Sequence, residues 1–354
     1  MARGNKKPAA TKAKPQKQSR PNTSKEIENS DSTQSVPLAL QQKCLDIFQR
    51  ALKPGEDDTK VLQEVKGHLY NRDFAAAFGQ DDYLRVYASR WSPSRALGYL
   101  QVLIDVQDVL FQGSQASVDS EDQAYKTVCL GGGAGAEVVA LAAWIHRQDD
   151  DSDVSPLKSL QADFVDIAAW QNVVSSLHEA VTTPQELSKY ASAAAREANI
   201  AMVPGNAYSA KFDQIDVLAL DLSNWQERLN QVDLVTLMFT LNELYSTSMA
   251  KTQKMLAHIT DCLAPGAHLL VVDSPGSYST VSINGAEKRY PMHWLLDFTL
   301  IGSQQSREDG DVPAKWEKLV SDESKWFRLL QGLRYAIELE NMRYQIHLYR
   351  RLPD

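Results

Sequence analysis

The order of apolar and polar positions after residue 124 predicts an α/β fold. Short apolar runs recur at residues 127–130, 163–167, 212–217, 232–239 and 268–273, and helical segments such as 136–146 and 246–263 lie between them. Buried strands of a parallel sheet form continuous apolar runs, and helices connect one strand to the next. We therefore expect a mostly parallel sheet with helices on both faces.

The end of the chain predicts a different pairing. Residues 335–340 and 344–349 have the composition of two strands joined by a tight turn, so we expect an antiparallel pair that closes the sheet. The long segment before them, 274–333, contains Trp294, Trp316, Trp326 and Phe327. We expect this segment to form a partly helical cap inserted into the α/β domain, 125–354.

Apolar positions before residue 112 follow the three- and four-residue spacing of helices, as in Leu45, Phe48 and Leu52. Ser92 followed by Pro93 predicts the start of a later helix, because proline is tolerated in the first turn. Residues 38–112 are therefore expected to form a helical N-terminal domain, followed by a polar linker at 113–124. Residues 1–37 have few aliphatic side chains, which predicts a disordered tail.

Charge is distributed unevenly along the 354 residues. Residues 1–25 contain eight Lys or Arg and no Asp or Glu; since the whole chain carries −8, the remainder carries −16. A basic tail of this kind is typical of a nuclear-import signal or a nucleic-acid contact, and a solubilising terminus is the alternative. We prefer import, which predicts a nuclear protein.

Several classes of protein are disfavoured by composition. No apolar stretch approaches the roughly 18–20 residues that span a bilayer. The three cysteines are too few and too scattered for a disulfide framework or a zinc site. We expect a monomer in a reducing compartment, without membrane contact or a metal ion.

The strongest chemical signal is a run of glycines, Gly131, Gly132, Gly133 and Gly135, between the first predicted strand and its helix. Such a turn brings backbone N–H groups and the positive end of a helix dipole to a ligand. It suits S-adenosylmethionine as well as a dinucleotide, because the spacing also satisfies the dinucleotide fingerprint. A purely structural glycine turn is the third possibility.

Other polar side chains follow the predicted strands. Asp166 is the expected carboxylate for the ribose hydroxyls, and Asp216 with Val217 is placed to recognise an adenine amino edge. Asn242 and Glu243 follow the fourth strand, where ligands of open parallel sheets bind. For Asn242, capping of the next helix is an equal alternative. Together these positions favour S-adenosylmethionine over a nicotinamide cofactor.

With these residues identified, the chain resembles the fungal family of large-subunit (25S) ribosomal RNA uridine-N(3) methyltransferases, a family of S-adenosylmethionine-dependent enzymes. The motifs that carry the resemblance are YASRWSPSRAL at 87–97, CLGGGAGAE at 129–137, LMFTLNEL at 237–244, VDSPGSY at 272–278, YPMHWLLD at 290–297 and ENMRY at 340–344. They cover the chain from about residue 40 to its end. The resemblance implies a Rossmann-like, seven-stranded class I methyltransferase sheet, a pre-60S ribosomal RNA substrate and a nucleolar location.

One position departs from the wider methyltransferase pattern. Cys129 stands two residues before Gly131, where an acidic residue usually helps to hold the methionine ammonium group. Glu137 is a poor substitute if it only favours the dipole of its helix. Arg90 or Arg95 is expected to meet the methionine carboxylate, and we assign Arg90 to the cofactor.

The resemblance also implies the chemistry. N(3) of uridine must lose a proton before it attacks a methyl group, so a carboxylate base is expected, and we favour Glu243 over Asp273. Asn242 is expected to orient the ring.

The target base must leave any paired helix to reach such a site, which requires aromatic side chains for stacking and basic side chains for phosphates. Tyr245 and Tyr278 are the predicted stacking residues. Arg85 and Arg95 are the predicted phosphate contacts, with internal ion pairs as the alternative. Two other functions stay open: an NAD-dependent oxidoreductase, and a non-catalytic ribosome-assembly factor that retains the fold.

Overall fold

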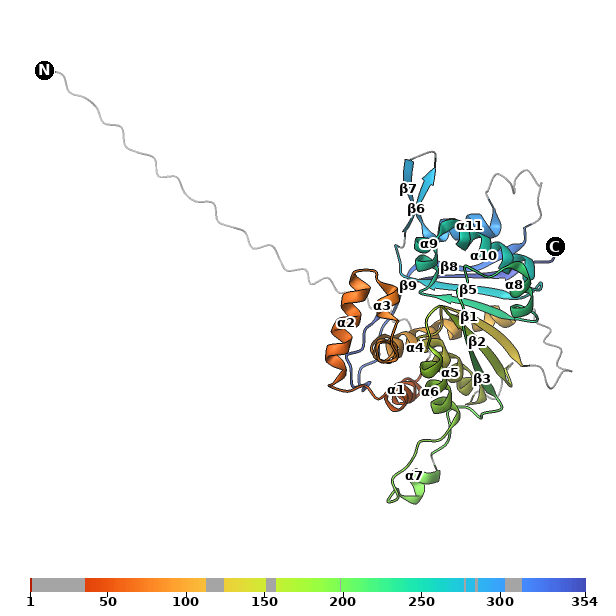
Figure 1. The fold of residues 1–354 in the computed structure, drawn as a ribbon. Coiled ribbons are helices and arrows are strands. Elements are labelled where there is room, and N and C mark those ends of the chain that lie inside the picture. Colours follow the sequence, from red (N-terminus) through yellow and green to blue (C-terminus); the bar gives the residue numbers. More distant parts are fainter. Residues whose placement is uncertain are drawn as a thin grey trace. The chain divides into compact units, whose positions relative to one another are not determined.

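The computed structural model describes Met1 and residues 36–112, 124–150, 157–197, 199–276, 278–283, 286–302 and 314–354. The predicted basic tail with its import signal, and nearly all of the predicted linker at 113–124, lie outside the described residues. Residues 35–354 form one unit by their contacts, and Figure 1 shows its helices and strands.

Seven strands form one sheet in the order β3-β2-β1-β4-β5-β9-β8. They are β1 (Tyr125–Leu130), β2 (Leu160–Asp166), β3 (Tyr208–Gln214), β4 (Leu234–Met238), β5 (His268–Asp273), β8 (Trp316–Phe327) and β9 (Met342–Arg351). The first five pair in parallel, and β9 pairs antiparallel with both β5 and β8. The predicted seven-stranded, mostly parallel sheet is confirmed. Strand order reverses between β1 and β4, which is where ligands bind in open α/β sheets.

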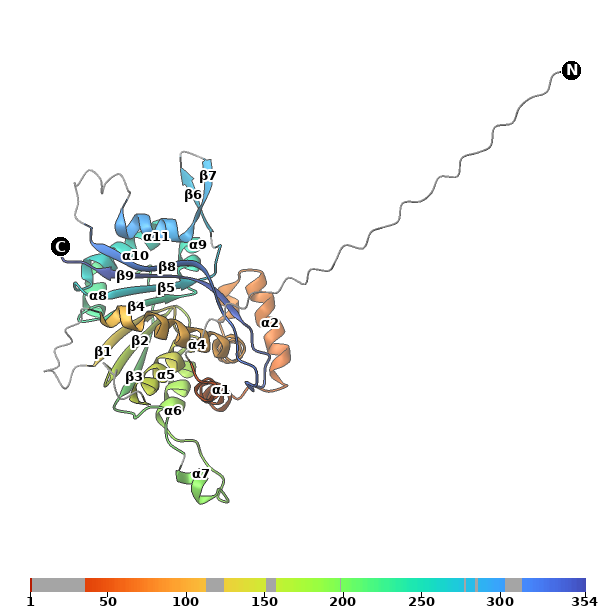
Figure 2. The same cartoon turned by 180° about the vertical axis from the view of Figure 1, so that it is seen from behind.

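Helices cover both faces of this sheet, as Figures 1 and 2 show. On one face, α1 (Leu38–Leu52), α4 (Asp81–Phe111), α5 (Ala136–Asp150) and α6 (Gln171–Thr182) share a hydrophobic cluster with the strands. On the other face lie α8 (Leu222–Arg228), α9 (Leu241–Thr247), α10 (Met249–Cys262) and α11 (Met292–Ile301). Strand alternation produces the two clusters, since Cys129 belongs to the first and its neighbours Val128 and Leu130 to the second.

Three shorter features complete the described fold. Helices α2 (Asp58–Tyr70) and α3 (Phe74–Ala77) lie between α1 and α4, and β6 (Tyr278–Ile283) and β7 (Ala286–Pro291) form a separate hairpin after β5. Helix α7 (Ala193–Glu197) belongs to an arm between α6 and β3 that projects away from the sheet in Figure 1. Among the described residues, no helix combines the length and the apolar character needed to cross a membrane.

The N-terminal helices are packed on the sheet. Leu97 and Leu100 of α4 belong to the same hydrophobic cluster as Val138 of α5 and Phe164 of β2. The predicted boundary at residue 112 therefore falls between elements that share a core, and the division of this region into two domains stays a prediction.

Helix α4 does not begin at Ser92, as the sequence predicted, but runs from Asp81 to Phe111 with Pro93 inside it. Proline has no N–H group, so the carbonyl of Ser89 does not receive the helical hydrogen bond that the N–H of residue 93 would normally donate. The Tyr335 hydroxyl donates to this carbonyl at 3.0 Å instead. A side chain from a distant segment thus satisfies the acceptor, and the helix continues through the proline.

The prediction of a strand at 335–340 is wrong. The antiparallel partner of β9 is β8, and the backbone around Ala336 is bound by the N-terminal helices: Gln49 accepts from the Ala336 N–H, and Gln42 accepts from the Arg334 N–H. These bonds take backbone groups that a sheet would need. The predicted cap at 274–333 contains α11, but also the hairpin β6–β7 and all of β8.

Candidate active site

The glycine turn lies between β1 and α5, as predicted. Gly131 and Gly135 have φ angles of 78° and 83°, a region that residues with a Cβ rarely adopt. A Cβ on Gly131 would lie 2.2 Å from the Oγ1 of Thr240, and one on Gly133 would lie 2.1 Å from the Cδ1 of Trp170. Packing alone thus requires these glycines. The position of the turn, at the crevice and at the start of a helix, is what points to a ligand.

A buried carboxyl group lies against this turn. Glu137 is 4% exposed and accepts hydrogen bonds from the Thr236 hydroxyl and the Cys129 thiol. Burial raises the pKa of Glu137 to about 7, although both hydrogen bonds act in the opposite direction. Glu137 therefore brings a carboxyl group from α5 to the position of Cys129, where an acid was expected. A role limited to the helix dipole does not account for this burial.

Two carboxylates lie at the ends of neighbouring strands beside the turn. Asp166 ends β2, accepts from the N–H of Ala168 at 3.0 Å, and lies 3.4 Å from the N of Gly133; burial raises its pKa. Asp216 follows β3 and accepts from the N–H of Leu218 at 2.9 Å, while Val217 is buried. The structure thus brings Asp166, Asp216 and the glycine turn to one edge of the sheet.

The ends of β4 and β5 form the other side of the crevice. Phe239 follows β4 with φ 57°, a strained conformation for an aromatic residue, and its N–H donates to the Val272 carbonyl at 2.7 Å. Asp273 ends β5 and accepts from the N–H groups of Asn242 at 3.0 Å and Ser274 at 2.7 Å. Asp273 is 3% exposed, and burial raises its pKa to about 6. Asn242 lies in the first turn of α9, and Asp273 satisfies its N–H, so Asn242 is not the cap of this helix.

Glu243, the predicted base, lies in the same turn of α9 but faces solvent. Its carboxylate accepts from the Arg72 guanidinium at 2.8 Å, and the two side chains are 44% and 61% exposed. Arg72 lies between α2 and α3, so this ion pair links the N-terminal helices to the end of β4.

Arg90 is not at the glycine turn. Its guanidinium pairs with Glu340 and contacts the carbonyl of Glu338. Arg95, the alternative, lies 5.3 Å over the ring of Phe239 and donates to the Tyr87 hydroxyl at 3.1 Å. These contacts favour Arg95 over Arg90 for the cofactor, because Arg95 lies beside the end of β4 and Arg90 is paired with Glu340. Among the described residues, no carboxylate lies within ion-pair distance of Arg95.

The predicted RNA contacts have different outcomes. Arg85 is held by two hydrogen bonds to Asp58, at 2.6 and 3.1 Å, which is the internal ion pair left open by the sequence. Tyr245 is 3% exposed in the core under α9, so a base cannot stack on it, and that prediction is wrong. Tyr278 begins β6 and pairs with Pro291 in the hairpin; its side chain lies outside the description.

Three aromatic residues near the site were missed. Tyr99 stacks on Phe239 at 6.2 Å, and Tyr87 and Trp170 lie 5.7 Å apart between α4 and the end of β2. Trp170 follows Asp166 by four residues, and an aromatic residue so soon after a predicted ligand carboxylate was the available signal. The described residues contain no group of three or more His, Cys, Asp or Glu side chains arranged to hold a metal ion.

These residues fit the chemical groups of S-adenosylmethionine. Carboxylates stand at the ends of β2 and β3 for hydroxyl and amino groups. Among the described residues, the buried carboxyl group of Glu137 pairs with no cation, and Arg95 forms no direct ion pair, although it acts electrostatically on Asp273. An amino acid tail carries one charge of each sign, which complements this pair.

The strand order, the glycine turn and the closing antiparallel strand define a Rossmann-like class I methyltransferase. Residues 46–350 match the family described as "Putative SAM-dependent methyltransferase". The chain is also 33% identical over 330 residues to the 25S rRNA (uridine(2843)-N(3))-methyltransferase of Saccharomyces cerevisiae, covering 87% of this chain and 85% of that relative. The chain belongs to this family of SAM-dependent methyltransferases, and S-adenosylmethionine is its cofactor.

Solved structures provide more distant similarities. An O-methyltransferase family protein from Burkholderia thailandensis aligns at 13% identity and a TM-score of 0.35, over 78% of this chain and 62% of that one. Human N-acetylserotonin methyltransferase, solved in complex with SAM, aligns at 13% identity and a TM-score of 0.35, over 87% and 72%. Similarities at this level say nothing about the substrate.

Proposed function

We propose that this methyltransferase modifies N(3) of a uridine in large-subunit ribosomal RNA during ribosome assembly. The observation that supports the proposal is the relative at 33% identity, whose name states this reaction and which matches over most of both chains. Deletion of the gene should remove one N(3)-methyluridine from large-subunit RNA. This is detectable because the modified base cannot pair and stops primer extension. Unchanged methylation after deletion would exclude the proposal.

The cofactor supplies an activated methyl group on a sulfonium centre. We assign its adenosine to Asp166, Asp216 and Val217, at the ends of β2 and β3, and its central part to the turn at Gly131, Gly132, Gly133 and Gly135. For the amino acid tail we assign the ammonium to Glu137 and the carboxylate to Arg95. The support for this pair is that neither side chain forms an ion pair among the described residues, and that both lie beside the crevice, where Arg95 also acts electrostatically on Asp273.

Two carboxyl groups are candidates for removing the N(3) proton. Glu243 remains the proposed base because solvent and substrate can reach it, but Arg72 must then release it. Asp273 is the competitor: burial raises its pKa to about 6, yet both of its oxygens already accept backbone N–H groups. Asn242, one residue from Glu243, is proposed to orient the uracil carbonyls.

A comparison of Glu243→Gln with Asp273→Asn separates the two bases. Loss of turnover in Glu243→Gln, with S-adenosylhomocysteine binding intact, supports Glu243. If Asp273 is the base instead, activity should fall as pH decreases through about 6, because protonation removes the acceptor. Normal turnover of Glu243→Gln would exclude Glu243.

We further propose that the protein acts on a pre-60S particle in the nucleolus, as a monomer, and that residues 1–25 direct its import. The support is the basic composition of this tail and the ribosomal RNA named for the relative. A fluorescent fusion should concentrate in the nucleolus, and removal of residues 1–25 should disperse it. Unaltered location after truncation would exclude the import role.

A further inference from the structure

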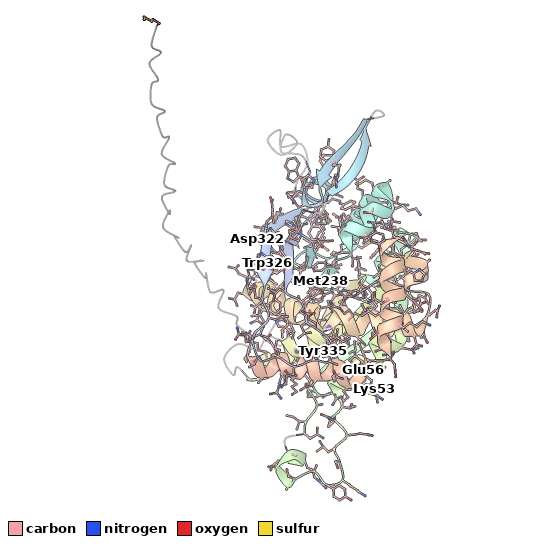
Figure 3. All side chains as sticks on the ribbon, turned by 90° about the vertical axis from the view of Figure 1, so that its left-hand side faces the viewer. Lys53, Glu56, Met238, Asp322, Trp326 and Tyr335 are labelled. Carbon is pink, nitrogen blue, oxygen red and sulfur yellow. The ribbon has the colours of Figure 1, made fainter. Side chains whose placement is uncertain are left out.

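An exposed tryptophan with two arginines lies at the end of β8. Trp326 is 47% exposed, and the guanidinium carbons of Arg328 and Arg343 lie 5.1 and 5.6 Å from its ring. Both arginines are exposed as well. The Nε of Arg343 donates to the Ser324 hydroxyl at 3.0 Å, which fixes one guanidinium plane next to the ring. Figure 3 shows Trp326 on β8, below the hairpin of β6 and β7 in that view.

The sheet register places this tryptophan at the edge that carries the candidate active site. Gln345 of β9 pairs with Asp273, and Arg343, two residues earlier, pairs with Trp326. β8 is parallel to β5, because both are antiparallel to β9, so Trp326 lies at the carboxyl end of its strand. Trp326 lies two strands away from Asp273, at about 4.8 Å per strand, and two residues further along the strand direction, at about 3.3 Å per residue. The two Cα atoms are therefore roughly 12 Å apart.

Alternation along the strands also places the two sites on one face. Tyr344 and Ile346 belong to the cluster under α4, so Arg343 and Gln345 face the other side. That side carries α9, with Asn242 and Glu243. A strand of RNA that delivers a base to the end of β4 would therefore pass next to Trp326.

We propose that Trp326, together with Arg328 and Arg343, is a platform on which a nucleotide neighbouring the target uridine stacks. The proposal rests on the proposed function, since it takes the RNA as substrate. Single-stranded RNA is held by stacking on aromatic rings and guanidinium planes, and arginine also binds its phosphates. Tyr245 is buried in the core, whereas Trp326 is an exposed ring of the kind that such a substrate requires, and it is flanked by two guanidinium groups.

The two arginines beside Trp326 favour RNA over a protein as the partner, because they can bind phosphates. Outside the tail the chain carries −16, so most of its surface repels a polyanion. At Trp326, two arginines lie against one exposed ring beside the crevice where the substrate must enter, although Asp322 and Glu323 of the same strand are exposed as well. A protein that docks on Trp326 is the competing outcome, and it would leave binding of isolated RNA unchanged.

The test uses the full chain and a fluorescein-labelled oligouridine of about 12 nucleotides, within the usual range of single-strand site sizes. Trp326→Ala should weaken RNA binding about 5- to 150-fold, and Trp326→Phe should retain most of it. Tyr190→Ala is the matched control. Tyr190 is 83% exposed with the Lys189 ammonium 5.0 Å from its ring, but it lies on the arm before β3, at the amino ends of the strands.

Calorimetry with S-adenosylhomocysteine on the same variants separates the two proposals. If the native chain binds neither this ligand nor RNA, both the function and the platform are excluded. If it binds both, and Trp326→Ala binds RNA as the native chain does, the platform is overturned and the function stands. Equal losses in the Trp326→Ala and Tyr190→Ala variants would also overturn the platform, because they would show a general surface effect.

Discussion

Replacing Glu137 with glutamine should stabilise the protein against unfolding at pH 8 far more than at pH 5. A carboxyl group whose pKa is raised on folding holds its proton more tightly in the folded state, so its ionisation opposes folding. This cost is absent below the unfolded pKa of 4.5, grows as pH rises, and is complete above about 7. The shift from 4.5 to about 7 corresponds to about 3.4 kcal/mol at full ionisation.

Urea unfolding at two pH values measures this cost. The ionisation of Glu137 should oppose folding by about 0.8 kcal/mol at pH 5 and about 3.3 kcal/mol at pH 8. The difference in unfolding free energy between the variant and the native chain should therefore increase by about 2.5 kcal/mol between the two. Altered hydrogen bonds to Thr236 and Cys129 contribute about 1 kcal/mol at either pH, which cancels in the comparison. The Glu227→Gln variant, changed at an exposed site on α8, should show no such increase.

The same variant tests the assignment of the cofactor ammonium. A cation beside Glu137 favours the ionised carboxylate, so the affinity of the native chain for S-adenosylhomocysteine should rise from pH 5 to pH 8. In Glu137→Gln this rise should be lost. An unfolding difference that is equal at both pH values would refute the burial of an ionisable carboxyl group. Parallel affinity profiles for the two proteins would refute the ammonium contact alone.

Three other substitutions test single contacts of the structure. Arg95→Met should weaken the binding of S-adenosylhomocysteine about 10- to 100-fold, but should not change the binding of an analogue that lacks the carboxylate. Equal losses of affinity for the two ligands in calorimetry would exclude the contact. Gly131→Ala should lower the melting temperature much more than Gly276→Ala does. Both glycines have a positive φ, but only a Cβ at Gly131 would meet neighbouring atoms. Equal shifts in melting temperature would contradict this explanation. Tyr335→Phe should lower the free energy of unfolding in urea by about 1 kcal/mol. The loss should be smaller in the Pro93→Ala background, where residue 93 again donates to the Ser89 carbonyl. Equal losses in the two backgrounds would contradict the role of Tyr335 in the helix.

Features with a local cause were predictable from the sequence. The apolar run that contains Val128 and Leu130 is a buried central strand, and such strands have no polar face. The glycine turn was found because residues 131 and 135 need backbone angles that only glycine adopts freely. Asp166 and Asp216 followed from these elements, since carboxyl ends of parallel strands meet at one edge.

The choice between Arg90 and Arg95 could not be made from the sequence. Five residues along a helix correspond to a rotation of about 140°, so the two side chains point in different directions. Helix α4 is apolar over most of its circumference in its second half, which hides the face that meets the crevice. The contacts of Arg95 with Tyr87 and Phe239 are what favour Arg95 over Arg90.

Strand β8 was missed for a different reason. Its register against β9 shifts between Lys318 and Val320 and again between Asp322 and Lys325. Each irregularity breaks the two-residue alternation by which strands are detected in a sequence. The consequence reaches the function, because Trp326 was expected in a partly helical cap and instead lies at the edge of the sheet beside β9.

The charges beside the glycine turn also decide between the two cofactors that the turn itself admits. A dinucleotide would place a pyrophosphate, with two negative charges, against the turn. Glu137 is already buried there with no cationic partner among the described residues, and a second anion would raise the cost of its ionisation further. The amino acid tail of S-adenosylmethionine offers this carboxyl group an ammonium and offers Arg95 a carboxylate. Under the proposed assignment, the absence of an acid at Cys129 is offset by a carboxyl group from the following helix and a guanidinium from α4, and the N-terminal helices then contribute to the cofactor site.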